Sequence, residues 1–331
     1  MKKLNIFVIL MLLVVSALVG CSSSEKTAGK NENASKKIEL NYWVPFSGGD
    51  GDFMKAMVEE FNKTNPDIQV KMLNLKWEEY YTKLRTAVAS KQAPDVAVAH
   101  SSKLGELVPG GMIQELDPIA EKAGVNWDSF NENILKATIF EDNHMAITLD
   151  THAMVMFYNK KILGEAGLLD DNGKPKMEPG AAGFVQFLKQ VQEKAPKNVM
   201  PYVGTSNGNS PYWMWWSLYS QMDGKLLSED GKKAAFNNKE GKEALQFISD
   251  LVYKDHLWPK NVKNGGEIFA AGQAAVNFNG VWSTGANEKS QDLDFGVMTL
   301  PQLFEKKATW GDSHTLVLPV QKQVDKKKQE A

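Results

Sequence analysis

The chain has 331 residues, long enough for two domains with sizeable cores, and its composition is that of an ordinary globular protein. It carries 38 Lys and Arg against 40 Asp and Glu, a formal net charge of -2, and no stretch concentrates basic residues on one face. These properties argue against a nucleic-acid partner, and the single cysteine excludes an internal disulfide framework.

The first residues have the pattern of a secretory signal. Lys2 and Lys3 precede an apolar run over residues 4–19, which is too short for a typical transmembrane helix. Leu18-Val-Gly-Cys21 then resembles the lipobox of bacterial lipoproteins. We therefore expect residues 1–20 to be a signal peptide, Cys21 to be the lipidated N-terminus, and residues 21–37 to be a flexible tether. An uncleaved anchor helix is the alternative, and it would leave the protein on the same extracytoplasmic membrane face.

The segment after the tether predicts an open parallel sheet. Residues 37–44, 68–75 and 95–100 read as strands. They alternate with a helix that places Met54, Met57, Val58 and Phe61 on one side, and with a second helix over residues 78–90. Such βαβ units predict an α/β fold in which ligands bind at the carboxyl ends of the strands. The polar and aromatic residues at those ends are Trp43, Phe46, Asp50, Trp77, Glu78, His100, Ser101 and Ser102.

The segment Asp150-Thr151-His152 leads into a short apolar run over residues 153–157, which predicts a buried strand. Side chains two apart on a strand share a face, so Asp150 and His152 should project together. Asn159 should cap a helix over residues 160–166 that ends at Gly167. We interpret this strand as the crossing from one lobe to a second, with a ligand bound at the crossing.

The remaining chain supplies further helices, strands and many tryptophans. Helices are expected around residues 184–191, from residue 211, and over 238–255, with strands at 199–204, 274–278, 295–300 and 315–320. A flat aromatic ring covers the apolar face of a sugar, and neighbouring polar groups take its hydroxyls. The candidates for such contacts are Trp213, Trp215, Trp216, Trp282, Asp312 and His314. Helical spacing prevents Trp213, Trp215 and Trp216 from all facing one way, so at least one should be structural.

Two other chemistries stay open at this point. Asp150-Thr-His152 and Asp312-Ser-His314 could bind zinc if the two units meet, but no cysteine accompanies them and the Trp-rich surroundings suit sugar better, so no metal or other cofactor is expected. Gly204-Thr-Ser206-Asn-Gly208 matches a nucleophile elbow, with His256 or His314 as a partner. Asn209-Ser-Pro211 separates it from the next helix, which favours an ordinary loop and a protein that is not an enzyme.

With these features in place, the chain resembles the extracellular solute-binding proteins, family 1, of bacterial ABC sugar importers (the maltose-binding-protein-like family). The segments that carry the resemblance are Trp43-Val-Pro-Phe-Ser-Gly-Gly, Phe61-Asn-Lys-Thr-Asn-Pro-Asp, Lys83-Leu-Arg-Thr-Ala-Val-Ala-Ser with Ala93-Pro-Asp-Val, Tyr158-Asn-Lys-Lys, Phe269-Ala-Ala-Gly-Gln-Ala-Ala and Asn279-Gly-Val-Trp282.

The resemblance implies two α/β lobes, each with a mostly parallel sheet flanked by helices, joined by crossing hinge strands. Lobe 1 would comprise residues 38–150 and 290–331, and lobe 2 residues 151–289. It further implies a monomer that binds an oligosaccharide between the lobes and delivers it to an ABC permease, with Trp282 stacked on sugar, and residues 100–102 and 150–152 as hydroxyl contacts. Family members continue with further helices, so we expect C-terminal helices to be missing here.

Overall fold

The structure, a computed structural model, describes residues 37–46 and 48–331. Cys21, the signal peptide and nearly all of the tether lie outside the described residues, so these predictions stay predictions. Within the described part, no helix combines the length and the apolar character that crossing a membrane requires. Lys37–Ala331 forms a single compact unit that contains two main sheets.

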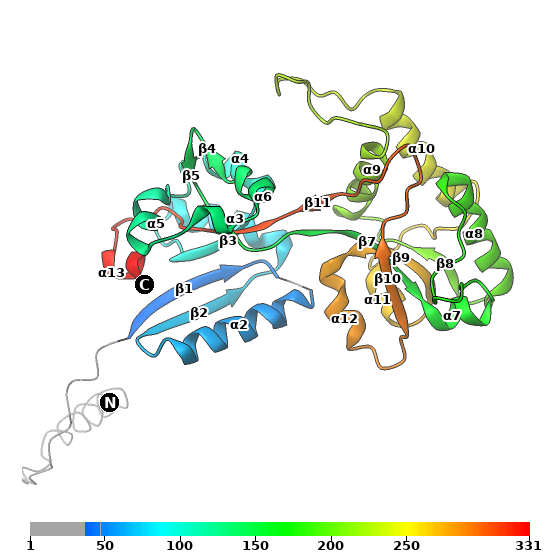
Figure 1. The fold of residues 1–331 in the computed structure, drawn as a ribbon, viewed down its shortest axis with the longest axis horizontal. Helices are drawn as coiled ribbons and strands as arrows, with labels where there is room; N and C mark the ends of the chain where they lie inside the picture. Colours follow the sequence, from blue (N-terminus) through cyan, green and yellow to red (C-terminus); the bar gives the residue numbers. More distant parts are fainter. Residues whose placement is uncertain (1–36, 47) are drawn as a thin grey trace, which may run out of the picture. The chain divides into compact units, whose positions relative to one another are not determined.

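The first lobe is built on a five-stranded sheet in the order β2-β1-β3-β12-β6 (Figure 1). Its strands are β1 (Ile38–Val44), β2 (Ile68–Asn74), β3 (Val96–His100), β6 (Ile147–Thr148) and β12 (His314–Val317). The helices of this lobe are α2 (Asp50–Thr64), α3 (Trp77–Ala89), α4 (Ser101–Leu107), α5 (Asp117–Ala123), α6 (Glu132–Lys136) and α13 (Lys326–Glu330). A small separate hairpin joins β4 (Ile139–Phe140) to β5 (Asn143–His144).

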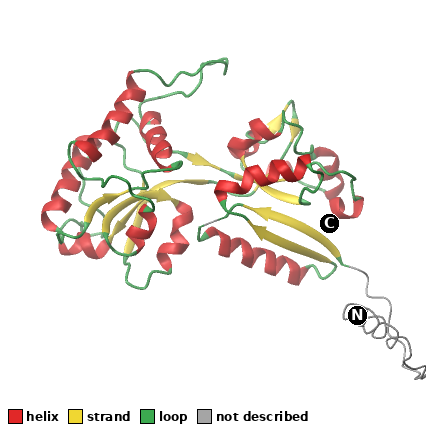
Figure 2. Ribbon diagram, turned by 180° about the vertical axis from the view of Figure 1, so that it is seen from behind, coloured by secondary structure: helices red, strands yellow, loops and turns green. Residues whose placement is uncertain are grey.

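The second lobe is built on the sheet β10-β7-β9-β8, with β11 also pairing with β7. Its strands are β7 (His152–Asn159), β8 (Met200–Val203), β9 (Ala274–Gly280), β10 (Phe295–Thr299) and β11 (Gly311–Asp312). Its helices, red in Figure 2, are α7 (Lys160–Glu165), α8 (Gly180–Lys194), α9 (Ser210–Ser220), α10 (Lys239–Tyr253), α11 (Gly265–Ala270) and α12 (Thr284–Glu288).

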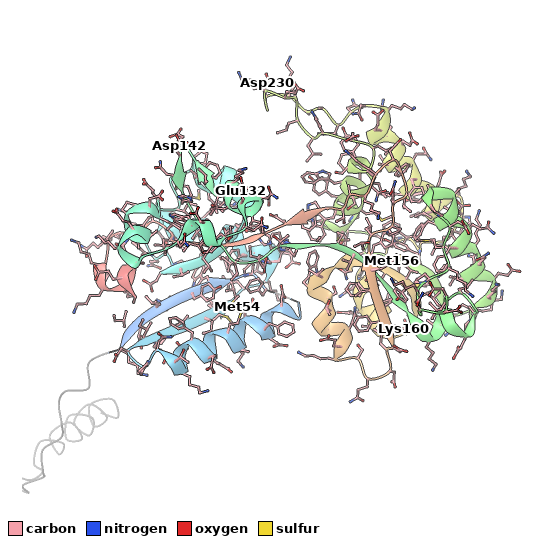
Figure 3. All side chains as sticks on the ribbon, in the orientation of Figure 1. Met54, Glu132, Asp142, Met156, Lys160 and Asp230 are labelled. Carbon is pink, nitrogen blue, oxygen red and sulfur yellow. The ribbon has the colours of Figure 1, made fainter. Side chains whose placement is uncertain are left out.

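Each sheet has its own apolar core. Met54 of α2 is buried in the first lobe and Met156 of β7 in the second (Figure 3). The predicted inner face of α8 is confirmed, since Phe184, Phe187 and Val191 are all buried. The predicted inner face of α2 is wrong in part. Met57 and Phe61 share a stripe with Met54, yet they remain 57% and 38% exposed, because the core of buried residues beside the sheet is contacted by Met54 and the partly buried Val58.

The chain crosses between the two sheets twice. It leaves the first sheet at β6 and enters the second at β7, and it returns from β11 to β12. The sequence predicted the crossing strand β7 and also the capped helix α7 that follows it. The Asn159 side chain accepts a hydrogen bond from the Ile162 backbone N–H at 3.0 Å, and Gly167 follows α7 with a φ of +69°.

Two expectations about the sheets are corrected. The pairs β1–β2, β1–β3 and β8–β9 are parallel, but β7 and β12 run antiparallel to their neighbours. These are the crossing strands, which enter each sheet from the other lobe. The expected return to lobe 1 at residue 290 is also wrong, because β10 pairs with β7 in the second sheet and the first sheet is rejoined only at β12.

Candidate functional site

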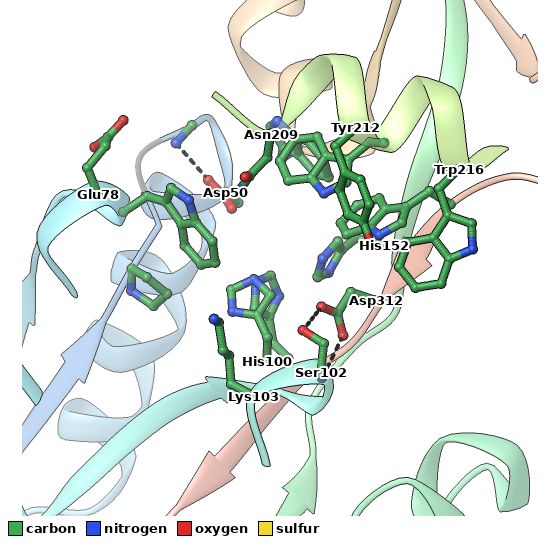
Figure 4. Close-up of a pocket in the computed structure, with 17 residues that line it drawn as sticks. Asp50, Glu78, His100, Ser102, Lys103, His152, Asn209, Tyr212, Trp216 and Asp312 are labelled. Atoms are coloured by element: carbon green, nitrogen blue, oxygen red, sulfur yellow. Dashed lines mark hydrogen bonds between the residues drawn. The ribbon is translucent and has the colours of Figure 1, made fainter. Parts of the chain in front are cut away.

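A cavity of about 440 Å³ lies where residues of the two lobes meet. Such a volume is in the range of roughly 300–1,000 Å³ that small-molecule sites occupy. Figure 4 shows the side chains that line it, drawn from both lobes. They are Pro45, Gly48, Asp50, Trp77, Glu78, His100, Ser102, Lys103, His152, Asn209, Tyr212, Trp213, Trp216, Trp282, Trp310, Asp312 and His314.

Three tryptophans from the second lobe and the returning strand form one wall. Trp213 of α9 stacks on Trp310, with ring centroids 4.5 Å apart and planes 25° apart. Trp282 meets Trp213 edge-on at 5.4 Å and Trp310 edge-on at 6.2 Å. Aromatic pairs favour these offset and edge-on arrangements. All three rings are half-buried, so each keeps surface for a ligand.

Local backbone geometry places the Trp282 ring. A short 3-10 turn over Val281–Ser283 follows β9, and the ring folds back over Gly280. A Cβ atom added at Gly280 would lie 2.1 Å from the Trp282 ring carbons, so no other residue type leaves room for the ring in this position. The glycine of the Asn279-Gly280 pair is therefore required by the position of the Trp282 ring.

Three buried histidines meet at the cavity, facing the tryptophans. His100 ends β3, His152 begins β7 and His314 begins β12. Their ring centroids are 4.3 Å (His152 to His314), 4.4 Å (His100 to His314) and 5.4 Å (His100 to His152) apart. Burial lowers the pKa of His100 to about 3, and the nearby His314 adds to this, so His100 is neutral at physiological pH.

The carboxylates near the histidines already have protein partners. Both oxygens of Asp150 lie 2.9 Å from His314 Nδ1. Burial alone would raise the pKa of Asp150, but the His152 and His314 rings beside it outweigh burial and hold that pKa well below its usual range. Asp150 is not among the residues that line the cavity and holds His314 from behind, so its role as a direct ligand contact stays a prediction.

Asp312 of β11 reaches the start of α4 in the first lobe. Its carboxylate accepts hydrogen bonds from the Ser101 hydroxyl at 2.7 Å, the Ser102 hydroxyl at 2.6 Å and the Ser102 backbone N–H at 3.2 Å. Burial alone would raise the pKa of Asp312, and these hydrogen bonds outweigh it and lower the pKa. Ser102 lines the cavity, whereas Ser101 does not.

Asp50 shapes the loop before α2. Its Oδ1 atom accepts hydrogen bonds from the backbone N–H groups of Gly48 and Gly51, both at 3.0 Å. Burial raises the pKa of Asp50 although these bonds oppose the rise. The carboxylate stays at the cavity wall, where it offers an acceptor for a ligand hydroxyl.

Most of the sequence-predicted site residues come together at this cavity, and four more besides Asp150 and Ser101 do not line it. Trp43 packs against the first-lobe core, and Phe46 is buried edge-on to His314 at 4.8 Å. Thr151 hydrogen-bonds through its hydroxyl to Ser313, and Trp215 stacks on Tyr219. Trp215 is thus the structural member of its helix, as helical spacing required.

The sequence reasoning did not single out five of the lining residues, namely Pro45, Gly48, Lys103, Asn209 and Tyr212, and it recognised Trp310 only as one of several tryptophans at element ends or loops. Tyr212 could have been found, since it lies one turn before Trp216 on α9 and its ring is 5.5 Å from that tryptophan. Trp310 follows no strand-end pattern. Its position depends on β11 pairing with β7, which no local signal reveals.

The serine of the suspected nucleophile elbow lies in a loop before α9. The Ser206 hydroxyl accepts a hydrogen bond from the Val262 backbone N–H at 3.1 Å, and the Ser206 N–H donates to the Val262 carbonyl at 2.8 Å. Ser206 is not among the residues that line the cavity. These contacts fit a loop anchor rather than a nucleophile.

Comparison with known proteins identifies the family. The profile of the bacterial extracellular solute-binding proteins matches residues 47–326. The chain belongs to this family. The arabinooligosaccharide-binding protein of Bacillus subtilis is 29% identical over 267 residues, which is 78% of this chain and 57% of that protein. The maltodextrin-binding protein MdxE of the same organism is 22% identical over 86% of this chain and 64% of its own length. This solute-binding chain thus spans less than two thirds of both relatives.

Solved structures confirm the two-lobed fold. An ABC substrate-binding protein from Listeria monocytogenes, in complex with cycloalternan, superimposes with a TM-score of 0.77 at 21% identity, covering 89% of this chain and 74% of that chain. Maltose-bound MalE3 of T. maritima gives a TM-score of 0.74 at 19% identity, with 88% and 74% covered. At these identities the likeness supports the fold alone.

Proposed function

We propose that this solute-binding protein captures an oligosaccharide in the cavity between its lobes and delivers it to the permease of an ABC importer. The observation that carries the proposal is the wall of Trp213, Trp282 and Trp310, which faces polar side chains across the cavity. Apolar walls with a few placed polar groups are typical of small-molecule sites. Two relatives named for arabinooligosaccharide and maltodextrin binding support the same class of ligand.

The contacts have a division of roles in this proposal. Trp282 and its two neighbours cover the C–H faces of the sugar rings, while Asp50, Glu78 and the exposed Ser102 line the cavity as partners for hydroxyls. No bond is broken, so the site needs no catalytic residue. Binding that bridges both lobes stabilises a closed state through the two crossings.

The remaining parts of the proposal concern the cell. Lipidation at Cys21 holds a monomer on the extracytoplasmic face of the membrane, and residues 21–37 let it reach the permease. Lobe 1 takes residues 38–150 and the segment from β12 onward, and lobe 2 takes the residues between.

Binding of arabino-, malto- and chito-oligosaccharides, measured by titration calorimetry, tests the proposal. One class should bind, and a ligand at about a hundred times its Kd should add roughly 2.7 kcal/mol to stability. Trp282→Ala should weaken that binding about tenfold or more, since stacking and buried apolar area contribute over about 1.4 kcal/mol.

Trp215→Phe is the matched control. Trp215 lies on the same helix as Trp213 but donates to the Gly241 carbonyl at 2.8 Å, away from the cavity. The sugar affinity of Trp215→Phe should stay within about twofold of that of the unmodified protein, because Trp215 does not line the cavity and phenylalanine keeps an aromatic ring beside Tyr212 and Tyr219. No binding of any sugar class, or equal losses in both variants, would contradict the proposal.

A further inference from the structure

The three histidines at the cavity are brought together by strand register. In the antiparallel pairing of β11 with β7, Asp312 lies opposite His152, and in the pairing of β12 with β3, His314 lies opposite His100. One nitrogen from each ring can be chosen so that all three lie within 4.8 Å of one another. The rings are 6–8% exposed, so this cluster is a buried feature of the fold and not a chance group on the surface.

Hydrogen bonds fix two of the rings, and the third makes only a long contact with Asp150. His314 Nδ1 is held by Asp150 at 2.9 Å, and His100 Nδ1 by the Tyr81 hydroxyl at 2.7 Å. His152 Nδ1 is buried without a hydrogen-bond partner among the described residues, 3.5 Å from Asp150 Oδ1. Buried polar nitrogens almost always have a close partner, and the 3.5 Å contact with Asp150 leaves this nitrogen weakly satisfied.

We propose that His100, His152 and His314 bind a divalent transition-metal ion such as Zn²⁺, with a fourth coordination position open to the cavity. Three imidazoles and one open position form a known tetrahedral zinc arrangement, with Zn–N distances of about 2.0–2.1 Å. Such distances place ligand nitrogens roughly 3.3 Å apart. The present nitrogens lie within 4.8 Å, so metal binding draws the rings together by rotations of the side chains.

The groups behind the histidines match what metal ligands require. A ligating histidine donates its second N–H to a carboxylate or another acceptor, which fixes the ring and its tautomer. Asp150 takes this part for His314, and the Tyr81 hydroxyl, which also accepts the His100 backbone N–H at 2.8 Å, holds the His100 ring in place through Nδ1. The carboxylates of Asp150 and Asp312 supply negative charge beside the cluster, and imidazoles bind a metal ion in their neutral form. Asp150 and His314 come from the two crossings, so the site joins both.

This inference does not depend on the identity of the sugar. The metal ion is bound by the three histidines, whereas the proposed sugar contacts centre on the tryptophans, of which Trp282 and Trp310 have ring centroids 5.6 Å and 5.8 Å from that of His152. A failed sugar screen leaves the metal test unaffected, and a failed metal test leaves the sugar proposal standing.

The inference is tested by titrating metal ions into the full-length protein after a chelator has removed any bound metal. Zn²⁺ should bind with one-to-one stoichiometry in calorimetry, and Co²⁺ should give the intense visible absorption bands of a tetrahedral nitrogen site. His152→Gln and His314→Gln should each weaken Zn²⁺ binding at least about 100-fold, and Asp150→Asn about 10–100-fold, the range found when groups behind metal ligands are removed.

His256→Asn is the matched control, because His256 lies outside the cluster at a φ of +56°, a backbone conformation that Asn tolerates. Its Zn²⁺ affinity should equal that of the unmodified protein. If the histidine variants fail to fold, the Co²⁺ spectrum of the unmodified protein decides alone. No Zn²⁺ binding, an octahedral Co²⁺ spectrum, or unchanged affinity in folded His152→Gln would overturn the inference.

Discussion

At the scale of single residues, Gly280 is as important to the cavity as Trp282, which lies in the turn after it. Gly280 has an ordinary φ of −79°, so its backbone tolerates any L-residue. What requires glycine is the Trp282 ring, which fills the space of a side chain at position 280. A variant here can therefore move the tryptophan without removing it.

Gly280→Ala should lower sugar affinity by about the same factor as Trp282→Ala, while the thermal unfolding midpoint falls only modestly. The reason is that the added methyl displaces the ring from the wall of the cavity, and stacking depends on its position. Calorimetry and tryptophan fluorescence measure both effects. Gly105→Ala serves as the control, since nothing lies within 4 Å of a Cβ at this position in α4 and alanine favours a helix over glycine by about 1 kcal/mol. Equal sugar affinity in Gly280→Ala and Gly105→Ala would disprove the positioning role.

Residue types and strand ends predicted much of the cavity but not the partners of its polar groups. The placement of Trp282, His152 and Asp50 at the cavity was expected, because each follows or begins a recognisable strand or turn. Asp150 and Asp312 were expected to face a ligand, and Asp312 does line the cavity, but their carboxylates also bind His314 and the α4 serines. Those partners are 164 and over 200 residues away in the chain, and no local pattern encodes such distances.

At the scale of elements, α4 is capped from the other end of the chain. No side chain of its own N-cap residue, His100, caps the helix; the carboxylate of Asp312 on β11 accepts the Ser102 N–H instead. A carboxylate at a helix N-terminus is favourable both as an acceptor and through the helix dipole. One side chain thus ties the returning crossing to the first lobe.

Asp312→Ala should reduce the free energy of unfolding by about 1–3 kcal/mol, because it leaves the Ser102 N–H and two hydroxyls without their acceptor. Urea unfolding followed by circular dichroism measures the loss. Asp67→Ala, at an exposed position, should change stability by no more than about 0.5 kcal/mol. A loss in Asp312→Ala as small as that of the control would show that water replaces the carboxylate.

The strands themselves were largely predictable, but their neighbours in the sheets were not. The apolar run in β10 marks a strand, yet nothing in it states that β7 is its partner rather than a strand of lobe 1. The strand β7 is eight residues long and pairs on both edges, with β9 on one side and with β10 and β11 on the other. Such pairing follows from tertiary packing, which the periodicity of one segment does not contain.

At the scale of the whole molecule, the two sheets are joined by two crossings, β6 to β7 and β11 to β12, and residues of one crossing contact residues of the other. The Leu149 N–H donates to the His314 carbonyl at 2.9 Å, and the Thr151 and Ser313 hydroxyls lie 2.9 Å apart. Two connections that lie side by side permit the lobes to bend about a shared axis, which is the arrangement expected of hinge closure around a ligand.

Oligosaccharide should therefore reduce the radius of gyration in solution, because closure brings the lobes together around the bound sugar. Small-angle X-ray scattering with and without saturating sugar measures the change. Trp282→Ala at the same sugar concentration should show a smaller decrease in proportion to its lost occupancy. An unchanged radius at proven saturation would mean that the cavity accepts its ligand without lobe movement.

The position of β12 also bears on the order in which the chain folds. This strand, at residues 314–317, lies inside the first sheet between β3 and β6, although the chain has by then built the entire second lobe. Until residue 317 is available, the β3 and β6 edges lack their partner, and unpaired edges promote aggregation. The first lobe consequently cannot complete its sheet until the residues of the second lobe have been synthesised.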